Sequence, residues 1–311
     1  MSPIRLAIVG LGKIARDQHV PAIAATEGIE LVAIASRNAA LEGVAHYETL
    51  DQLLAKAPDI EAVALCTPPQ VRRGQAAAAL AAGKHVLLEK PPGATVAELG
   101  PLVAAAEGTG KTLFATWHSR FAPAVEPARA FLAERQIRSV SIVWKEDVRV
   151  WHPGQDWIFE PGGLGVFDPA INAFSILTRI LPRPVFVTAA DLAFPENRAA
   201  PIAGEIDFSD DAGTPIRAEL DFLQTGPQTW DIHVDTDAGR LTLSLGGAKL
   251  FHEGRTLVDE KEAEYRGIYR HFVDLVRRGA RDVDLAPLVL VADAFMLGRR
   301  RSAPPFIEDQ P

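Results

Sequence analysis

Residues 4–15 of the chain read IRLAIVGLGKIA, a short apolar run that ends in glycines and leads into a helix-like segment. The pattern predicts a strand, a tight turn and a helix in succession. Gly10 permits the tight turn, Gly12 lets a ligand approach the main chain, and Ala15 lets helix and strand pack closely. Because a helix N-terminus presents free N–H groups and positive partial charge, we expect it to hold a pyrophosphate. The stretch therefore favours a dinucleotide-binding domain.

The first part of the chain, to about residue 117, alternates short apolar runs with helix-like stretches. Strands are predicted at 4–9, 30–35, 61–66, 85–88 and 112–117, and helices at 13–25, 49–57, 70–82 and 95–109. The apolar runs lack polar alternation, which is typical of parallel strands covered on both faces. Alternating strands and helices predict an α/β fold, a doubly wound parallel sheet of the Rossmann type.

Beyond residue 118 the pattern changes. Helices are predicted at 123–135, 164–180, 261–278 and 285–300, a strand at 139–150, and a series of alternating strands from 185 to 258. That alternation is typical of a large, mostly antiparallel sheet with one buried face. We predict a Rossmann domain over 1–118 and an α+β substrate-binding domain over 119–311, whose last helix could pack back on the first domain. The active site is expected in the cleft between them.

Composition restricts the classes of partner. A net charge of −8 argues against nucleic acid, because phosphate binding needs a basic face. No apolar run is long enough to cross a membrane, and we expect no signal peptide before the first strand. Cys66 is the one cysteine, so no internal disulfide is expected, which suits a cytoplasmic protein. No set of Cys, His and carboxylate residues has metal-ligand spacing, so no metal is predicted.

The residues at the end of the second predicted strand indicate which cofactor is bound. A carboxylate there holds the ribose 2′-hydroxyl of NAD, whereas an arginine accommodates the 2′-phosphate of NADP. Here residues 36–38 read SRN, and neither Asp nor Glu is present. Ser36 and Arg37 therefore favour NADP. Nothing at this tip repels a free 2′-hydroxyl, so NAD is compatible as well.

Two further stretches carry candidate chemistry. Residues 89–92, EKPP, follow a predicted parallel strand at the sheet edge where ligands bind, and the prolines restrict the backbone at Lys90. Such a lysine can hydrogen-bond a sugar hydroxyl. Residues 162–172, GGLGVFDPAIN, form a glycine-rich turn that leads into a helix. Asp168 and Asn172 are four apart and share one face of that helix.

The motifs at 10–15, 66–69 (CTPP), 89–91 and 162–172 together resemble the Gfo/Idh/MocA oxidoreductase family, in the family's order and across essentially the whole chain. Within the family, the chain most resembles the bacterial aldose 1-dehydrogenases, through the stretches WKED at 144–147, WHPGQ at 151–155 and FDP at 167–169. The resemblance implies oxidation of the anomeric carbon of a pyranose such as L-arabinose or D-galactose to the lactone, with NAD(P)+ as the oxidant.

The resemblance also implies residue roles. Lys90 and Asp168 match the family's reacting pair beside the nicotinamide. Many relatives, such as the inositol dehydrogenases, carry a histidine base four residues after the aspartate, but here that residue is Asn172. An amide cannot accept the proton, so the base is Asp168, Lys90 or His152. We hypothesise that Asp168 and Lys90 share the work, and leave open which of them is the base. Asn172 would hold the same hydroxyl or the ring oxygen.

Several other positions are assigned to ligands. Glu146 and His152 are expected to read ring hydroxyls. Trp144 and Trp151 either stack on a pyranose face or pack in the core. Further cofactor contacts are expected from a set of residues in the first domain: Lys13, Ile14, Thr67, Pro68, Glu89 and Lys90.

Two alternative functions and a homodimeric assembly are left open. The chain could be a cyclitol or trans-dihydrodiol dehydrogenase of the same family, although Asn172 counts against a cyclitol enzyme. It could also be a regulator that binds a dinucleotide or a sugar without catalysis, against which the retained Lys90 and Asp168 speak. Relatives often pair through the helix-free face of the second-domain sheet, so a homodimer through that sheet is compatible with the resemblance.

Overall fold

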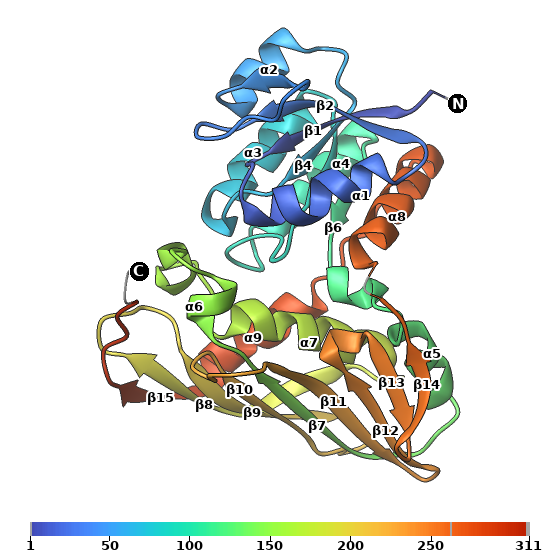
Figure 1. The fold of residues 1–311 in the computed structure, drawn as a ribbon, viewed down its shortest axis with the longest axis vertical. Coiled ribbons are helices and arrows are strands. Elements are labelled where there is room, and N and C mark those ends of the chain that lie inside the picture. The colour runs from blue at the N-terminus through green and yellow to red at the C-terminus, as the bar shows by residue number, and fades with distance from the viewer. Residues whose placement is uncertain (1, 262, 309–311) are drawn as a thin grey trace. The chain divides into compact units, whose positions relative to one another are not determined.

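The computed structural model describes residues 2–261 and 263–308 and divides into two compact units (Figure 1). Unit 1 comprises Met1–His118 and Glu264–Leu285, and unit 2 comprises Ser119–Ala263 and Ala286–Pro311. The segment 264–285, which the sequence assigned to the second domain, thus groups with unit 1. Its helix packs against the first helix of that unit. Among the described residues, no helix combines the length and the apolar character that crossing a membrane requires.

Unit 1 is built on a parallel sheet, which confirms the predicted Rossmann-type fold. The sheet has the strand order β3-β2-β1-β4-β5-β6 and comprises β1 (Ile4–Val9), β2 (Ile29–Ala35), β3 (Ala45–Tyr47), β4 (Ala62–Leu65), β5 (His85–Leu88) and β6 (Leu113–Ala115). Every residue of β4 is buried, as expected for a central strand covered on both faces. Strand β3 was not predicted, because it is only three residues long and mostly exposed.

The helices of unit 1 follow the predicted alternation. They are a π-helix (Ala15–His19), α1 (Val20–Ala24), α2 (Leu50–Lys56), α3 (Pro69–Ala81), α4 (Leu99–Thr109) and α8 (Glu264–Arg278). The start of α2 is fixed by Thr49, whose side chain accepts a hydrogen bond from the Gln52 N–H. In Figure 1, α8 lies beside α1 although it comes from the far end of the chain. A 3-10 turn (His118–Phe121) follows β6.

Unit 2 contains a nine-stranded sheet of order β14-β13-β12-β11-β7-β10-β9-β8-β15. Its strands are β7 (Ile137–Lys145), β8 (Val185–Pro195), β9 (Ala203–Asp210), β10 (Ile216–Asp221), β11 (Thr229–Thr236), β12 (Gly239–Ser244), β13 (Lys249–His252), β14 (Arg255–Asp259) and β15 (Gly298–Ala303). The pairs β7–β10 and β8–β15 are parallel and the other neighbours antiparallel, which confirms a mostly antiparallel sheet.

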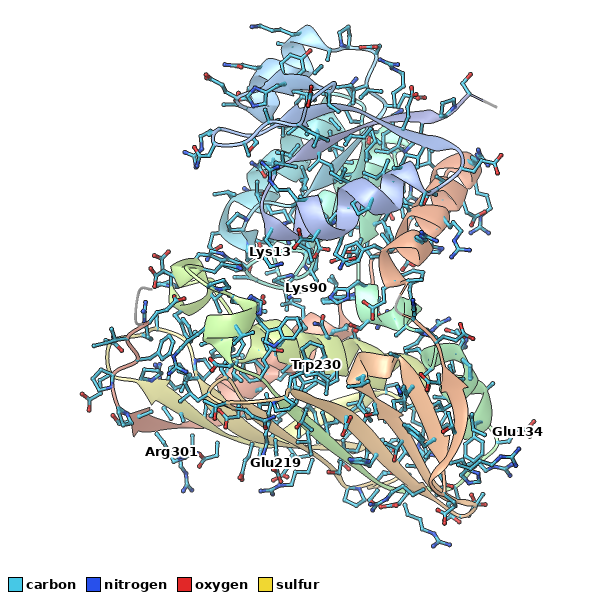
Figure 2. All side chains as sticks on the ribbon, viewed as in Figure 1. Lys13, Lys90, Glu134, Glu219, Trp230 and Arg301 are labelled. Carbon is cyan, nitrogen blue, oxygen red and sulfur yellow. The ribbon has the colours of Figure 1, made fainter. Side chains whose placement is uncertain are left out.

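The two faces of this sheet differ. One face packs against helices, as Figure 1 shows for α5 (Val125–Leu132), α7 (Phe167–Ile180) and α9 (Ala286–Leu297). Along β10, Ala218 and Leu220 are buried while Arg217 and Glu219 are exposed, the alternation of a strand with one covered face. Figure 2 shows Glu219 and Arg301 on the side away from the helices. The buried core of unit 2 therefore lies between the sheet and the helices.

Two predicted elements of unit 2 end early. The predicted strand 139–150 stops at Lys145, and residues 148–151 form the short helix α6 (Val148–Trp151), because the Asp147 side chain accepts a hydrogen bond from the Arg149 N–H, 3.0 Å. The predicted helix 285–300 stops at Leu297, and the following residues form β15 beside β8. Two 3-10 turns, Asp156–Phe159 and Leu245–Gly247, complete the unit.

Candidate active site

The glycine turn after β1 fits a dinucleotide. Gly10 has a φ of +89°, and a Cβ added there would lie 2.9 Å from the Thr67 Cγ2 atom, so glycine is required. At Gly12, no heavy atom of the described residues comes within 4 Å of an added Cβ. The main chain is therefore open to a diphosphate at this point. Lys13 and Ile14 are exposed at the start of the helical stretch.

The tip of β2 carries the predicted determinants of cofactor choice. Ser36 is half-buried and Arg37 is exposed. The Ser36 N–H donates to the Tyr47 carbonyl, 2.9 Å, and the Ser36 carbonyl lies 2.8 Å from the His46 Nε2 atom. Both partners belong to β3, so the strand that the sequence missed fixes the backbone of this tip.

A buried arginine ties together the ends of β4 and β5. Arg72, at 3% exposure, donates to the carbonyls of Thr67, Glu89 and Pro91. The Thr67 hydroxyl donates to the Gln75 side chain, 2.5 Å. Thr67 is half-buried and is held by these hydrogen bonds, whereas the neighbouring Pro68 is exposed. Sequence reasoning missed Arg72, because one arginine in a helix carries no signal that distinguishes it from a surface residue.

Glu89 lies inside unit 1, at 3% exposure. Its carboxylate accepts hydrogen bonds from the Lys90 backbone N–H, 2.5 Å, and from the Tyr265 hydroxyl, 2.7 Å, and it lies 3.2 Å from the His19 Nε2 atom. Burial favours the neutral carboxyl, but the His19 hydrogen bond and the positive charges nearby lower the pKa of Glu89 to about 2. The predicted cofactor contact of Glu89 remains a prediction.

The surroundings of Glu89 form a larger polar cluster. His19 is fully buried and its Nδ1 atom lies 2.6 Å from the Tyr269 hydroxyl. Burial favours neutral imidazole, but the neighbouring Cys66, Tyr269 and Glu89 groups raise the pKa of His19 well above its usual range.

A second histidine, His118, borders the same cluster. It stacks on the Tyr265 ring and pairs with Glu264. Burial would lower the pKa of His118, but the charge of Glu264 and its hydrogen bond raise it. The sequence did not predict this cluster.

Unit 2 brings three predicted site residues together. Glu146 follows β7 and Asp168 lies in the first turn of α7, and both are 2% exposed. The His152 Nε2 atom lies 3.3 Å from the Glu146 Oε1 atom and 3.8 Å from the Asp168 Oδ2 atom. One imidazole, 18% exposed, therefore sits between two buried carboxylates. Their individual roles remain predictions.

Trp230 completes this group and was missed by sequence reasoning. Its indole N–H donates to the Glu146 Oε2 atom, 2.8 Å. Figure 2 shows Trp230 on the helix side of the sheet. The signal that could have found it is register: Trp230 faces Trp144 across the antiparallel pair β11–β7, and alternation places both on the buried face.

The two tryptophans considered for stacking on a sugar differ in exposure. Trp144 is 3% exposed and stacks on Trp230 at a ring distance of 6.1 Å, which is core packing. Trp151 is 39% exposed, with its ring 4.8 Å from that of Trp230. Asn172 lies half-buried on α7, one turn after Asp168. An exposed aromatic ring thus lies against a tryptophan that hydrogen-bonds Glu146.

Lys90 belongs to unit 1, and Asp168 and Asn172 belong to unit 2, so their joint action remains a prediction. Lys90 is half-buried and directly follows Glu89. Over residues 2–261 and 263–308, no group of three or more His, Cys, Asp or Glu side chains is arranged to hold a metal ion.

Comparison with known proteins gives concordant matches. The sequence model of the Gfo/Idh/MocA oxidoreductase family, NAD-binding Rossmann fold, matches residues 4–116. A galactose 1-dehydrogenase of Pseudomonas fluorescens is 46% identical over 308 residues, which cover 99% of this chain and 100% of that protein. The crystal structure of a D-galactose-1-dehydrogenase protein from Rhizobium etli is 58% identical, with a TM-score of 0.95 and 99% of each chain covered.

A more distant structure is KijD10, a 3-ketoreductase from Actinomadura kijaniata in complex with TDP-benzene and NADP. It is 20% identical, with a TM-score of 0.83, and the match covers 97% of this chain and 100% of that one. At this identity the likeness shows the fold alone.

Proposed function

The chain belongs to the Gfo/Idh/MocA oxidoreductase family, with its NAD-binding Rossmann fold, and we propose that it is an aldose 1-dehydrogenase. It oxidises the anomeric carbon of a galactose-type pyranose to the lactone. Sequence identities of 46% and 58% to two galactose 1-dehydrogenases, each over 99% of this chain, support this reaction. The observation that carries the proposal in the structure is the His152 imidazole between the buried carboxylates of Glu146 and Asp168.

That group suits a polyhydroxylated ring. A carboxylate accepts hydrogen bonds from two hydroxyls, and an imidazole can donate or accept. The contacts of His152, at 3.3 and 3.8 Å, are long for hydrogen bonds, so its ring nitrogen has capacity for a ligand hydroxyl. The exposed ring of Trp151 offers an apolar face beside these polar groups. D-Galactose, L-arabinose and D-fucose share the hydroxyl arrangement from C2 to C4, so one pocket accepts all three.

The reacting groups are Lys90, Asp168 and Asn172. Lys90 and Asp168 divide the work: one accepts the proton of the C1 hydroxyl while the other positions and polarises that oxygen. Asn172 holds the same hydroxyl or the ring oxygen, since an amide can donate and accept hydrogen bonds but is no base at neutral pH. Loss of the proton leaves electron density on the oxygen, which expels the C1 hydride as the lactone carbonyl forms.

The cofactor is a nicotinamide dinucleotide, and the open main chain at Gly12 and the exposed helix start fit its diphosphate. When bound, it supplies the ring carbon C4 that accepts the hydride. We propose that NADP is preferred and NAD also used, because Ser36 and Arg37 stand where an NAD-specific site has a carboxylate. Thr67, Pro68 and Lys13 are proposed to complete the cofactor contacts.

We also propose a cytoplasmic homodimer that pairs through the helix-free face of the nine-stranded sheet. This face carries ion pairs such as Arg217–Glu205, 2.6 Å, and Lys145–Glu219, 3.0 Å. Light scattering after size-exclusion chromatography measures the mass directly. A monomer at micromolar concentration would contradict the dimer.

The test of the activity is a panel of aldoses mixed with the protein and NADP+ or NAD+, followed at about 340 nm, where the reduced nicotinamide absorbs. We expect turnover with D-galactose, L-arabinose and D-fucose and much slower turnover with D-glucose, the C4 epimer of D-galactose. Oxidation of cyclitols or trans-dihydrodiols in place of aldoses would identify the alternative enzyme. Binding of NADP+ without turnover of any sugar would identify a regulator.

A further inference from the structure

The polar cluster around Glu89 lies next to Lys90 in the chain, and we propose that Glu89, His19 and Tyr265 are positioning residues for Lys90. The inference rests on the proposed function, in which the Lys90 side chain acts on the sugar hydroxyl. It assigns a role to three buried groups that the reaction itself does not use. It also differs from the predicted direct contact of Glu89 with the cofactor.

The Glu89 carboxylate is hydrogen-bonded to the main chain of Lys90. The Glu89 Oε2 atom accepts from the Lys90 N–H at 2.5 Å, while the Glu89 Oε1 atom faces the Tyr265 hydroxyl at 2.7 Å and His19 at 3.2 Å. Each carboxylate oxygen thus has at least one donor. The carboxylate cannot rotate without breaking these contacts, so it fixes the peptide plane that enters Lys90.

Holding a charge on the buried Glu89 carboxylate has a cost. A buried carboxylate loses its hydration, and only close partners offset that loss. Burial opposes ionisation, yet the hydrogen bond and charge of His19 keep the pKa of Glu89 at about 2, so the group is an anion at neutral pH. Hydrogen bonds to an ionised acceptor are shorter and stronger than neutral ones. The charge therefore stiffens the link to Lys90.

Arg72 holds the other side of the same segment. Arg72 donates to the carbonyls of Glu89 and Pro91, the residues on either side of Lys90. The N–H of Lys90 and both flanking carbonyls are therefore held by two buried side chains, those of Glu89 and Arg72. A fixed backbone also fixes the direction in which the Lys90 side chain leaves the main chain.

The partners of Glu89 come from distant parts of the sequence. Tyr265 lies on α8, 176 residues from Glu89 in sequence, and His19 lies in the π-helix before α1. In Figure 1, α8 returns to unit 1 and lies beside α1. A segment from the end of the chain thus supplies the hydroxyl that completes the carboxylate's partners. This placement explains why residues 264–285 belong to unit 1.

The primary test compares Glu89→Gln and Tyr265→Phe with the full-length wild-type protein. The amide of the Glu89→Gln variant presents an NH2 group to one of the donors, so the Lys90 N–H or the Tyr265 hydroxyl loses its acceptor. We expect kcat with D-galactose and NADP+ to fall by about a hundredfold in Glu89→Gln and by about fivefold in Tyr265→Phe, as misplacement of a reacting group predicts. The dissociation constant of NADP+, from fluorescence titration, should change less than about threefold.

A second readout does not depend on turnover. Lysine-selective 15N labelling resolves the Lys90 amide, which is assigned by its loss in Lys90→Arg. In the wild type we expect a downfield proton that exchanges slowly with solvent, because it is bound to a buried anion. In Glu89→Gln the resonance should move upfield and exchange at least about tenfold faster. Thr26→Val is the control, because it removes a buried hydroxyl that bonds Ala22 in the same unit. It should leave both readouts unchanged.

The outcomes separate the two proposals. An unchanged Lys90 amide or an unchanged kcat in Glu89→Gln overturns the positioning role. A large rise in the dissociation constant of NADP+ with an unchanged kcat makes Glu89 a cofactor contact instead. Wild-type turnover in Lys90→Ala removes the proposed catalytic role of Lys90 and with it the positioning role, even if the amide responds to Glu89→Gln. A perturbed amide in a protein that oxidises no aldose identifies a structural tether and a failure of the proposed function.

Discussion

Two buried carboxylates, Glu89 in unit 1 and Glu146 in unit 2, have similar neighbours and different geometry. Both contact a histidine and an aromatic donor, Tyr265 for Glu89 and Trp230 for Glu146. The three donors around Glu89 lie at 2.5–3.2 Å and its histidine, His19, is fully buried. Glu146 has one short hydrogen bond, to Trp230 at 2.8 Å, and its histidine lies at 3.3 Å with 18% exposure.

The difference separates a structural cluster from a binding cluster. The hydrogen-bonding capacity around Glu89 is used within the protein, so the cluster can fix a backbone but has little left for a ligand. The cluster around Glu146 keeps a partly exposed imidazole with long contacts, which can exchange them for ligand hydroxyls. Substitutions in the first cluster should therefore lower stability and, through the backbone of Lys90, kcat, whereas those in the second should act mainly on catalysis and sugar binding.

The largest expected effect is that of Asp168→Ala in the binding cluster. Loss of the carboxylate removes a proposed acid–base group, and kcat should fall about a thousandfold. The variant should stay folded, with the free energy of unfolding in urea lowered by about 1–3 kcal/mol, the range for removal of a buried hydrogen-bonding group. Glu219→Gln, on the helix-free face, is the control. Turnover near the wild-type level in Asp168→Ala would exclude Asp168 from the reaction.

The next effect is a contrast in stability between Glu89→Ala and Glu146→Ala. The first leaves the His19 charge buried without its anion and should lower the free energy of unfolding by about 3 kcal/mol. The second removes one hydrogen bond, from Trp230, and should cost about 1 kcal/mol. Urea unfolding followed by circular dichroism gives both values under the same conditions. Equal losses would show that the two clusters are structurally alike.

Much of this arrangement is predictable from sequence where local pattern governs the structure. The glycines after β1 and the apolar runs of β1 and β5 give those strands their observed bounds, because burial on both faces leaves an uninterrupted apolar signature. The sequence also assigned Glu146, His152 and Asp168 to one predicted substrate site, and the structure brings these three side chains together. Both cases depend on short stretches whose residues act together.

What the sequence left out depends on contacts between distant residues. His19 and Tyr269 are 250 residues apart, and no periodicity connects a histidine in one helix with a tyrosine in another. Strand β3 is too short to show a pattern, and the capping bond from the Arg149 N–H to Asp147 ends a run that otherwise reads as strand. Such features emerge only when tertiary packing selects one partner among many.

A smaller effect comes from two matched substitutions, each of which removes one hydrogen-bond donor from one of the two carboxylates. Trp230→Phe removes the N–H that holds Glu146 and keeps an aromatic ring next to Trp144. We expect the KM for D-galactose to rise about fivefold with kcat reduced less than about twofold, as for loss of one hydrogen bond to a sugar-binding carboxylate. Tyr265→Phe, the equivalent deletion at Glu89, should lower kcat and leave KM nearly unchanged. The reverse pattern would exchange the roles of the two clusters.

The smallest expected effect is a change in the free energy of unfolding at acidic pH. It distinguishes Glu89 from His85, another titrating group of unit 1. Burial, together with the charge of Lys111, lowers the pKa of His85 to about 4, and its Nδ1 atom accepts from the Thr112 N–H at 3.0 Å. Because this folded-state pKa lies below the unfolded value of about 6.5, the contribution of His85 to stability is complete above that pH and is lost as the pH falls toward 4.

Glu89, with a folded-state pKa of about 2, loses its contribution only as the pH falls below about 4.5. Between pH 7 and 5 Glu89 therefore contributes no loss and His85 contributes a loss, while His19 and His118, whose pKa values are raised, contribute a gain.

His85→Gln removes the titrating ring and should reduce the loss of unfolding free energy between pH 7 and pH 5 by somewhat less than about 1 kcal/mol, since His85 is partly solvated. Urea midpoints at the two pH values measure it, with His252→Gln in unit 2 as the control. In Glu89→Gln the His19 charge loses its anion, so the stability that His19 gains as the pH falls through about 6.5 should shrink and the loss between these pH values should exceed that of the wild type. An unchanged or smaller loss there would mean that the Glu89 carboxylate does not stabilise the His19 charge, which contradicts its assignment as a charged tether.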